Sequence, residues 1–417
     1  MKTAFVQKCS ECSREYRPEE MVCRCPNCSG RIEILYDYDR IRENLIRKKS
    51  DRTAYFWQFS ELLPVLDRTK PVSLGEGGTC LLRCKRLESR LGLRELYVKD
   101  ETRNPTGSFK DRCSAITLSK ASECSVTAVV MPSSGNAGAS ACAYSARAGV
   151  ACYVFVPSTV EAAKMTQILI YGGRVVRIEG ALIDCHFLVS EASKRYGWQE
   201  ITTNSLSNVY STQGSKTTAY EICVELGWET PDWILLPFGG GGNLYGHWLG
   251  FQEFLKLGFI NKMPRMAAVQ AAGCAPFVKA FRERITPAKA EAWMNPETVA
   301  TGIACGYPYD IDVALPAIYQ SNGTAETVTD KEILDAQMLL AKAEGIFAEP
   351  SAAASIAGLK KLIDNGIIDR SDLIVCEVTG NGLKDTQSAM KASKIPPVTV
   401  HSLEELDRVL QLPNQSI

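Results

Sequence analysis

The stretch WILLPFGGGGNLYG, residues 233–246, carries three consecutive signals that decide the fold class. Its first six residues, 233–238, form a short apolar run of the kind found in a buried strand. Four glycines follow, and the spacing of apolar residues over 244–257 then favours a helix. A strand, a glycine-rich loop and a helix in this order predict one unit of an α/β fold, with a ligand site after the strand.

The same alternation recurs along most of the chain. We expect strands at 95–99, 126–131, 151–156, 174–178, 233–238, 266–271 and 373–378, and the clearest helices at 109–121, 137–148 and 244–257. Strands that alternate with helices in this way predict an α/β protein with largely parallel strand pairing.

Composition and charge argue against several classes of protein. The chain has 417 residues, 45% of them hydrophobic, and Lys+Arg equals Asp+Glu at 47 each. This balance gives no excess of positive charge that would attract nucleic acid. No apolar run reaches the ~18 residues that a membrane span needs. The N-terminal segment MKTAFVQKCSECS lacks the apolar core of a signal peptide. We therefore expect a cytoplasmic protein with neither a nucleic-acid nor a membrane partner.

Five of the sixteen cysteines lie between residues 9 and 36. Cys9 with Cys12 and Cys25 with Cys28 form two C-x2-C pairs, separated by twelve residues. Four thiolates on two tight turns suit one tetrahedral Zn²⁺ without an open position, so the spacing favours a structural zinc ribbon over a redox pair. Cys23 is a spare thiol that could replace Cys25. We expect zinc removal to loosen this unit without loss of a cofactor.

Two loops have the features of anion sites. The glycine run at 239–242 leaves backbone N–H groups bare at the start of a helix, which favours a phosphate cradle over a merely flexible loop. The segment PSSGNAG, 132–138, offers hydroxyls, an amide and backbone donors after another strand; a simple helix cap would explain it equally well.

A lysine completes the set. In NPTGSFKDR, residues 104–112, Lys110 follows a turn and opens the predicted helix. Taken alone, it would be a surface lysine. Beside two anion loops, it fits a site for pyridoxal 5′-phosphate, because a lysine amine forms an imine that an amino-acid substrate can exchange. Thr379, at the end of the strand over 373–378, could bond the pyridine nitrogen, although the segment TGNGLKD also reads as a plain turn.

Taken together, these segments resemble the threonine synthase family of fold-type II pyridoxal-phosphate enzymes. The segments that carry the resemblance are SLGEGGTCLL, KDETRNPTGSFKDR, SSGNAGASACAYSARAG, PFGGGGNLYG, AVQAAGCAPFVKAF, EGIFAEPSAAASIAGL and TGNGLKD. They occur in the family's order from the cysteine ribbon to about residue 390.

The resemblance implies a role for each matching residue. Lys110 would form the internal aldimine and move protons, and Phe109 would position the ring. Asn136 would bond the 3′-oxygen of the cofactor, and Thr379 would face its nitrogen. The residues implied at the cofactor phosphate are Gly239, Gly240, Gly241, Gly242 and Asn243. Ser133, Ser134 and neighbouring amides would hold the substrate carboxylate. Beyond these, we expect Gly135, Thr106, Ser108, Asn208 and Lys216 to contribute to the substrate site. The implied reaction converts O-phosphohomoserine and water into threonine and phosphate.

The substrate half departs from the family pattern. Ser211 and Ala304 stand where arginines are expected near the substrate phosphate, so Lys216, Arg103 and Asn208 become the candidates for that group. Weak activity on phosphohomoserine, improved by Ser211→Arg, is then expected. Two alternatives stay open: a β-replacement or β-elimination enzyme that acts on serine or phosphoserine, and a degenerate domain that only binds a ligand or partner.

The expected organisation has three parts. A zinc-ribbon unit covers 1–36, a catalytic core of two interleaved α/β subdomains covers 37–390, and an extension covers 391–417. The smaller subdomain is expected at about 110–205, and the whole protein is expected to be a homodimer.

Overall fold

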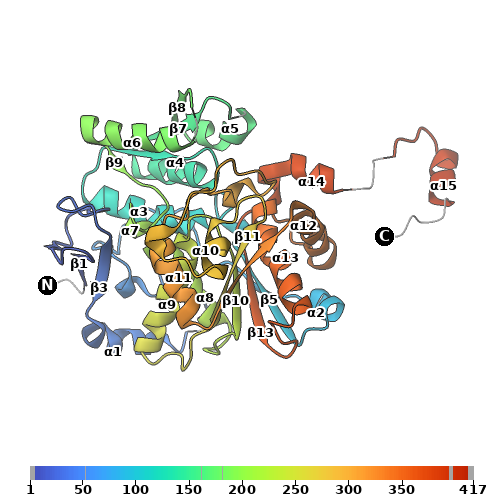
Figure 1. The fold of residues 1–417 in the computed structure, drawn as a ribbon, viewed down its shortest axis with the longest axis horizontal. Helices are drawn as coiled ribbons and strands as arrows, with labels where there is room; N and C mark the ends of the chain where they lie inside the picture. Colours follow the sequence, from blue (N-terminus) through green and yellow to red (C-terminus); the bar gives the residue numbers. More distant parts are fainter. Residues whose placement is uncertain (1–4, 52, 161, 181, 394–397, 412–417) are drawn as a thin grey trace.

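The computed structural model describes residues 5–51, 53–160, 162–180, 182–393 and 398–411. These residues form three sheets with helices packed around them (Figure 1). The strands are β1 (Phe5–Cys9), β2 (Glu15–Tyr16), β3 (Ile32–Tyr36), β4 (Leu81–Arg83), β5 (Glu95–Asp100), β6 (Ala128–Pro132), β7 (Ala151–Pro157), β8 (Arg174–Ile178), β9 (Gln199–Glu200), β10 (Trp233–Pro237), β11 (Arg265–Ala271), β12 (Thr324–Val328) and β13 (Leu373–Val378).

The helices match the expected alternation, so the predicted α/β class is confirmed. They are α1 (Tyr38–Lys48), α2 (Lys85–Leu91), α3 (Lys110–Glu123), α4 (Asn136–Ala148), α5 (Ala162–Ile170), α6 (Leu182–Tyr196), α7 (Val209–Ser215), α8 (Thr217–Glu225), α9 (Gly242–Lys256), α10 (Pro276–Arg282), α11 (Ile311–Gln320), α12 (Asp330–Glu344), α13 (Pro350–Asp364), α14 (Thr386–Ala392) and α15 (Leu403–Gln411). Short 3₁₀ helices are η1 (Ser60–Leu62), η2 (Glu101–Arg103), η3 (Pro287–Lys289), η4 (Thr301–Ile303) and η5 (Gly382–Asp385).

The larger sheet has six strands in the order β12-β11-β10-β13-β5-β4. All neighbours are parallel except β4, which pairs antiparallel with β5 at one edge. In Figure 1, α12 and α13 lie to one side of this sheet and α8, α9 and α11 to the other. Every residue of β10 and β13 is buried, which explains why both strands are mainly apolar in the sequence, with Glu377 in β13 as the charged exception.

The smaller sheet lies within residues 128–200 and has the order β8-β7-β6-β9. Its strands are all parallel. Figure 1 shows α3 and α4 between this sheet and the larger one. Almost all of α3 is buried as a result, including polar residues, so α3 is a central helix rather than a surface helix.

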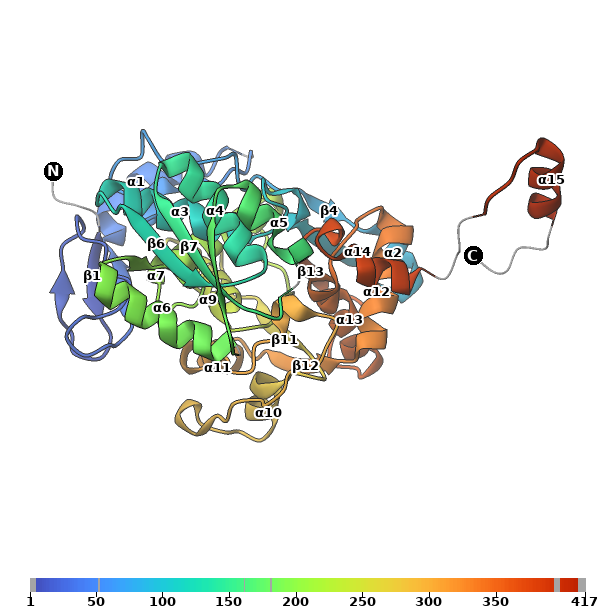
Figure 2. The same ribbon diagram turned by 90° about the horizontal axis from the view of Figure 1, so that it is seen from above.

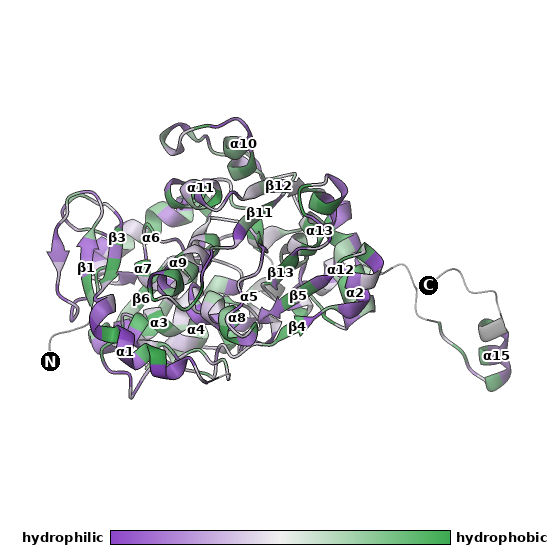
Figure 3. Cartoon of the chain, turned by 90° about the horizontal axis from the view of Figure 1, so that it is seen from below, coloured by the Kyte–Doolittle hydropathy of each residue, from purple (hydrophilic) through white to green (hydrophobic). Residues whose placement is uncertain are grey.

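The N-terminal sheet is antiparallel, with the order β2-β1-β3, and it belongs to residues 5–36, named the ribbon unit below. Figure 2 shows this unit at one end of the molecule. The α1 helix follows it, capped by the Asp37 side chain. Ile41 and Leu45 are the buried residues of α1, whose mixed polar and apolar colouring is visible in Figure 3.

The C-terminal α15 lies away from the sheets in Figure 1. Residues 1–4 of the predicted ribbon unit, and residues 394–397 and 412–417 of the predicted extension, lie outside the described residues. The exact domain boundaries stay a prediction. Across the described ranges, no helix combines the length and apolar character that crossing a membrane requires.

Parallel pairing explains where the candidate site forms. The loops after β6, β10 and β13 all leave the carboxyl ends of parallel strands, which is where open α/β sheets bind ligands. These loops contain Ser133, Gly239 and Thr379.

Candidate active site

The lysine motif forms a tight turn that leads directly into α3. The Gly107 amide donates to the Asn104 carbonyl at 2.8 Å, and the φ angle of Gly107 is +82°, a left-handed conformation that favours glycine. The amide and hydroxyl of Thr106 donate to the Asp111 carboxylate at 2.7 and 2.6 Å. Lys110 is therefore fixed as the first residue of α3, while the Thr106 side chain already has a partner.

This turn is bound to the segment that follows β13. The Phe109 amide donates to the Thr379 carbonyl at 3.0 Å, and Ser108 forms a β-bridge with Gly380. The Ser108 hydroxyl is buried and has no hydrogen-bond partner within the described chain. Segments 270 residues apart thus form one wall of the site, with Thr379 beside the lysine turn.

The amine of Lys110 is partly buried and unpaired. Its Nζ lies 4.5 Å from the centre of the Phe109 ring, and no described residue forms a hydrogen bond or ion pair with it. Burial lowers the pKa of Lys110. The nearby groups that oppose this effect on its pKa are Cys113, Cys305, Glu377 and Asp310. A depressed pKa increases the neutral, nucleophilic fraction of the amine.

The glycine loop leaves a row of backbone donors free. None of the amides from Gly239 to Asn243 has an acceptor among the described residues, and α9 begins at Gly242. Gly241 has a φ angle of +106°. Free amides at the start of a fifteen-residue helix form an anion cradle, because both the N–H groups and the helix dipole point positive charge outward.

Asn243 joins this loop to β13. Its Nδ2 donates to Glu377 Oε2 at 2.5 Å, and its Oδ1 is buried without a partner in the described chain. Burial, with Glu101 nearby, raises the pKa of Glu377 to about 8. The Glu377 carboxyl is therefore protonated near neutral pH.

The loop after β6 offers a second set of donors. Ser133 Oγ accepts hydrogen bonds from the amides of Gly135 and Gly138 at 3.4 and 3.1 Å, which closes the loop. The amides of Ser134, Asn136 and Ala137 have no acceptor in the part of the chain described. Gly135 is exposed, so a carboxylate can reach these donors from solvent.

Asn136 and Glu349 meet across the site. Asn136 Nδ2 donates to Glu349 Oε1 at 2.8 Å. A β-carbon on Gly380 would lie 2.5 Å from the same oxygen, so a side chain at 380 would displace this pair. Burial raises the pKa of Glu349, and Asn136 and Lys384 oppose the shift. Nothing in the local sequence of Glu349 signalled this contact, because it joins residues 213 positions apart.

Lys384 is a second cation that the sequence did not single out. Its Nζ donates to Gln167 Oε1 on α5 at 2.7 Å. A β-carbon on Gly107, in the lysine turn, would lie 3.2 Å from Lys384 Cε. Burial lowers the pKa of Lys384, whereas Glu349 and Asp111 raise it. The only available signal was its position in TGNGLKD.

Lys216 does not join these groups. Its Nζ is fully buried in an ion pair with Glu253 at 2.8 Å and lies 4.5 Å from the centre of the Tyr36 ring. Lys216 therefore already has a carboxylate partner, at the interface with the ribbon unit. Arg103 is mainly exposed and pairs with Asp100 at 2.9 Å. We do not include either cation in the proposed site.

Asn208 and Ser211 lie at a small cavity of about 10 Å³ next to Cys113 and Thr202. Asn208 Nδ2 donates to the carbonyl of Thr202 at 3.0 Å, and both Asn208 and Ser211 are buried. A cavity of this size holds roughly one water molecule and cannot hold a phosphate. The expected gain from Ser211→Arg therefore has no structural basis, because an arginine there would overpack the core.

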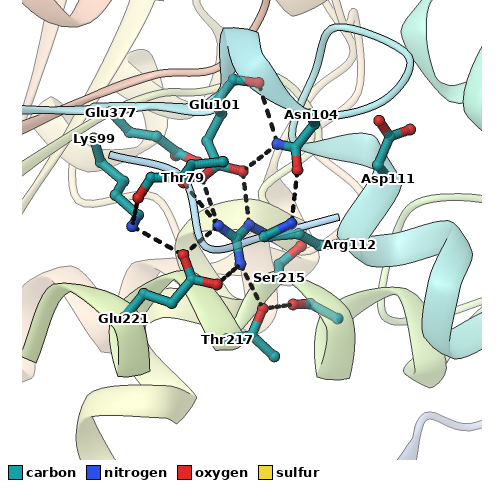
Figure 4. Close-up of polar contacts among 12 residues, drawn as sticks. Thr79, Lys99, Glu101, Asn104, Asp111, Arg112, Ser215, Thr217, Glu221 and Glu377 are labelled. Atoms are coloured by element: carbon teal, nitrogen blue, oxygen red, sulfur yellow. Dashed lines mark hydrogen bonds and ion pairs between the residues drawn. The ribbon is translucent and has the colours of Figure 1, made fainter. Parts of the chain in front are cut away.

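A buried network of charges supports the lysine turn from below (Figure 4). Arg112, next to Lys110, donates twice to Glu101, at 2.7 Å each, and twice to Glu221, at 2.6 and 2.7 Å. Lys99 Nζ lies 2.9 Å from Glu221 Oε2. Burial would raise the pKa of Glu221, but Arg112 and Lys99 outweigh it and lower that pKa to about 2.

The four predicted zinc ligands form a compact cluster in the ribbon unit. The Sγ atoms of Cys9, Cys12, Cys25 and Cys28 lie within 4.8 Å of one another. Tetrahedral Zn–S bonds of 2.3 Å require S–S separations of about 3.8 Å, so the cluster fits such an ion. Cys23 lies outside it, 3.7 Å from Asn208 Oδ1, which removes Cys23 as a substitute ligand.

The geometry fits pyridoxal 5′-phosphate on two observations. The free amides at 239–243 form a cradle for a phosphate, and the unpaired Lys110 amine is free to bond an aldehyde. The cradle follows β10, and Lys110 opens α3 after the turn that follows β5 and η2.

Comparisons with known proteins agree with this fit. Residues 72–380 match the family model described as Pyridoxal-phosphate dependent enzyme. The threonine synthase of Methanocaldococcus jannaschii is 44% identical over 412 residues, covering 98% of this chain and 100% of that protein. The threonine synthase of Methanosarcina acetivorans is 40% identical and covers 96% and 97%, and that of Mycobacterium bovis is 39% identical and covers 84% and 94%.

Solved structures share the fold at lower identity. Threonine deaminase isoform 2 from Solanum lycopersicum has a TM-score of 0.64 at 20% identity, with 76% of this chain and 83% of that chain covered. Maize serine racemase has a TM-score of 0.64 at 19% identity, with 80% and 94% covered. The family model and the full-length relatives show that the protein belongs to the threonine synthase family of pyridoxal-phosphate-dependent enzymes.

Proposed function

We propose that the protein is a threonine synthase, which converts O-phosphohomoserine and water into threonine and phosphate. The observations that carry this proposal are the Lys110 amine, which is unpaired among the described residues, the phosphate cradle and the second loop of free amides. The full-length similarity to threonine synthases at 40–44% identity supports the same activity.

The protein's own residues supply binding and proton transfer. The amides from Gly239 to Asn243 would hold the cofactor phosphate, and Lys110 would hold its aldehyde carbon. Asn136 would bond the ring oxygen with its remaining N–H, and Thr379 would face the ring nitrogen. When bound, pyridoxal phosphate acts as the electron sink that makes the protons on the substrate carbons removable.

The chemistry at the substrate assigns Lys110 a second role. The Lys110 amine would take protons from Cα and from Cβ of the substrate, and its lowered pKa suits it as a base. The proton taken from Cβ would be delivered to Cγ, which becomes a methyl group as the phosphate leaves. The hydroxyl of water would then add at Cβ, the second proton of water would end on the released phosphate, and the Cα proton would be returned. The free amides of Ser134, Asn136 and Ala137 would hold the substrate carboxylate, with Ser133 and Gly135 completing that loop.

The substrate phosphate needs a cation, since arginines are lacking at 211 and 304. Lys384 is the candidate that we propose, because its side chain is partly buried beside the lysine turn and, among the described residues, its Nζ bonds only to a neutral amide. One lysine gives a single point charge instead of a bidentate arginine fork.

A substrate comparison tests the proposal. Purified protein loaded with pyridoxal phosphate should release inorganic phosphate from O-phosphohomoserine and form threonine in equal amount. Phosphoserine and serine should not be consumed, because the similar full-length relatives are threonine synthases rather than β-eliminating enzymes. Consumption of phosphoserine or serine without turnover of phosphohomoserine would move the protein to the β-replacement class.

We further propose that Cys9, Cys12, Cys25 and Cys28 bind one structural zinc ion. The compact sulfur cluster supports this assignment, and the four thiolates would leave no position for a reacting ligand. Elemental analysis should find about one zinc per chain, and Cys12→Ser should lower that content. A metal-free protein from chelator-free purification would contradict the site.

We also propose that the enzyme works as a cytoplasmic homodimer. Light scattering on the purified chain should give about twice the 45.7 kDa chain mass. A mass of one chain that persists at high protein concentration would contradict the dimer.

A further inference from the structure

Arg31 connects the ribbon unit to the catalytic body. It directly precedes β3 and is buried. Its Nη1 donates to Asp310 Oδ1 at 3.0 Å, and its Nη2 donates to Asp312 Oδ1 at 2.6 Å. Among the described residues, the other hydrogen bonds between the ribbon unit and the body involve α3, α7 and the residues that flank them.

Asp310 forms part of the wall behind the glycine loop. Its amide donates to the Gly240 carbonyl at 2.9 Å, which fixes the loop backbone. A β-carbon on Gly242 would lie 3.0 Å from Asp310 Oδ2, so the carboxylate touches the base of the cradle. The amide and hydroxyl of Ser205 also donate to this carboxylate. Asp310 therefore sets the position of the loop and carries a negative charge close to it.

The negative charge of the Asp310 carboxylate must be balanced by a nearby cation. The cradle is built for a phosphate dianion, and an unpaired carboxylate behind it would repel that dianion at low dielectric. Asp310 is completely buried, so water cannot screen the repulsion. Arg31 is the cation that faces it, and a buried carboxylate left without its partner is strongly unfavourable.

The cysteine cluster holds Arg31 in place. The Ser10 amide donates to the Arg31 carbonyl at 3.0 Å, and the Cys25 amide donates to the Gly30 carbonyl at 3.0 Å. A β-carbon on Gly30 would lie 2.9 Å from Cys9 Sγ, so the backbone before Arg31 packs directly on a metal-ligand sulfur. A cavity of about 270 Å³ lies beside Arg31, between β3 and α9, and leaves that part of the interface unpacked.

We propose that Arg31 is a positioning residue for the cofactor phosphate, and that the ribbon unit thereby controls cofactor affinity. The inference rests on the proposed use of the glycine loop for pyridoxal phosphate. Arg31 acts through Asp310: it neutralises the carboxylate and holds it in the orientation that supports Gly240 and Gly242. Zinc removal should then weaken cofactor binding, which replaces the expectation that the cofactor is unaffected.

The test measures pyridoxal phosphate affinity rather than turnover. Cofactor-free full-length protein is titrated with pyridoxal phosphate, and the visible absorbance of the lysine adduct gives the Kd. Arg31→Gln should raise the Kd about tenfold or more, because a buried charged pair is lost. Arg24→Gln, which changes an exposed arginine of the same unit, should leave the Kd within about twofold. Circular dichroism and zinc content should match wild type in both variants.

A second variant separates charge compensation from simple packing. Arg31→Gln combined with Asp310→Asn removes the unpaired carboxylate, so the Kd should return to within about threefold of wild type. Arg31→Lys keeps the positive charge but loses the planar guanidinium that bonds two carboxylates, so its Kd should be intermediate. This variant replaces Arg31→Gln in the test if Arg31→Gln does not fold. Chelation of zinc should raise the Kd of wild type but add nothing to that of Arg31→Gln.

Two results would overturn the inference alone: an unchanged Kd in Arg31→Gln, or a double variant that binds as weakly as the single one. A wild-type protein that takes up no pyridoxal phosphate at all would overturn the proposed function as well. The two failures are distinguishable because only the second one affects wild type.

Discussion

Lys110 owes its chemistry to what surrounds it rather than to its residue type. Many lysines of this chain are exposed, but the amine of Lys110 is partly buried, unpaired within the described chain and next to free backbone donors. Burial lowers the pKa of Lys110 and so favours the neutral amine. Lys216 is also buried, but its ammonium group forms an ion pair with Glu253. The presence or absence of an ion-pair partner, rather than burial, therefore distinguishes Lys216 from Lys110.

Lys110→Ala should abolish threonine formation and leave the fold intact, because the side chain makes no hydrogen bond or ion pair with any described residue. The visible absorbance of the lysine adduct should disappear, while the circular dichroism spectrum stays that of wild type. A borohydride-reduced adduct that maps to another lysine would show that the assignment is incorrect.

Lys384→Ala should raise the KM for O-phosphohomoserine by roughly tenfold or more, since it removes one charged hydrogen bond to the substrate phosphate. Lys384→Arg should retain much of the affinity because it keeps the charge. Lys360→Ala, on the exposed face of α13, is the control and should change neither kcat nor KM. Equal KM values for all three variants would remove Lys384 from the substrate site.

For single residues, the sequence could predict only those roles that neighbouring residues in the chain reveal. Lys110 and the glycine loop were identifiable because turn residues and a strand end surround them in sequence. Glu349, Lys384 and Asp310 depend on contacts between distant segments, which no local pattern records. The assignment of substrate roles to Lys216 and Asn208 rested on their nearness to Ser211 in the sequence, which does not reveal that both are buried.

Among the elements, α3 shows how a polar sequence can be a core element. The sequence predicted a helix at 109–121, and the structure buries every residue from Asp111 to Ala121 although several of them are polar. Arg112 is tolerated inside because Glu101 and Glu221 each accept two hydrogen bonds from it. The network joins η2, α3 and α8 directly beneath the lysine turn, as Figure 4 shows.

Arg112→Met should therefore lower the free energy of unfolding by about 3–5 kcal/mol, because it leaves buried carboxylates without a partner. Arg103→Met removes the exposed pair with Asp100 and should cost only about 0–1 kcal/mol. Urea denaturation of both variants provides the comparison. Equal losses in the two variants would show that burial of the network does not matter for stability.

For the whole molecule, the repeated order of strand and helix was sufficient to predict the α/β class and parallel pairing. In the two α/β sheets, the strands β4, β9 and β12 were not predicted from the sequence, and neither were the ribbon-unit strands β1, β2 and β3. β4 and β9 have three and two residues, too few for a pattern to be visible. The division into sheets, and the position of β13 between β10 and β5, also depend on tertiary pairing that periodicity does not encode.

The stability of the whole molecule should fall as pH rises from about 5 to 8, in part through Glu377. Burial raises its folded-state pKa to about 8, far above the roughly 4.3 of an unfolded glutamate. Between these values the folded chain holds a proton that the unfolded chain has released, so rising pH favours unfolding, by on the order of 1 kcal/mol per pH unit.

Glu377→Gln removes this titration and should flatten the decline, measured as the free energy of unfolding at several pH values. Glu191→Gln, a change on the exposed surface of α6, should leave the slope as in wild type. The Glu377 assignment would be incorrect if the wild-type slope survived in Glu377→Gln.

The position of β13 has a consequence for synthesis on the ribosome. β5 ends at Asp100, but its parallel neighbour β13 ends only at Val378, so the larger sheet stays incomplete while the intervening residues are made. At a synthesis rate of 5–20 residues per second, the residues between the end of β5 and the end of β13 take roughly 15–55 s to make. The smaller sheet needs only residues 128–200 and can form during that time. A ribosome-stalled chain that ends before residue 373 should therefore resist proteolysis within the smaller sheet and remain open to cleavage around β5, where a trigger-factor-like holdase would be expected to bind.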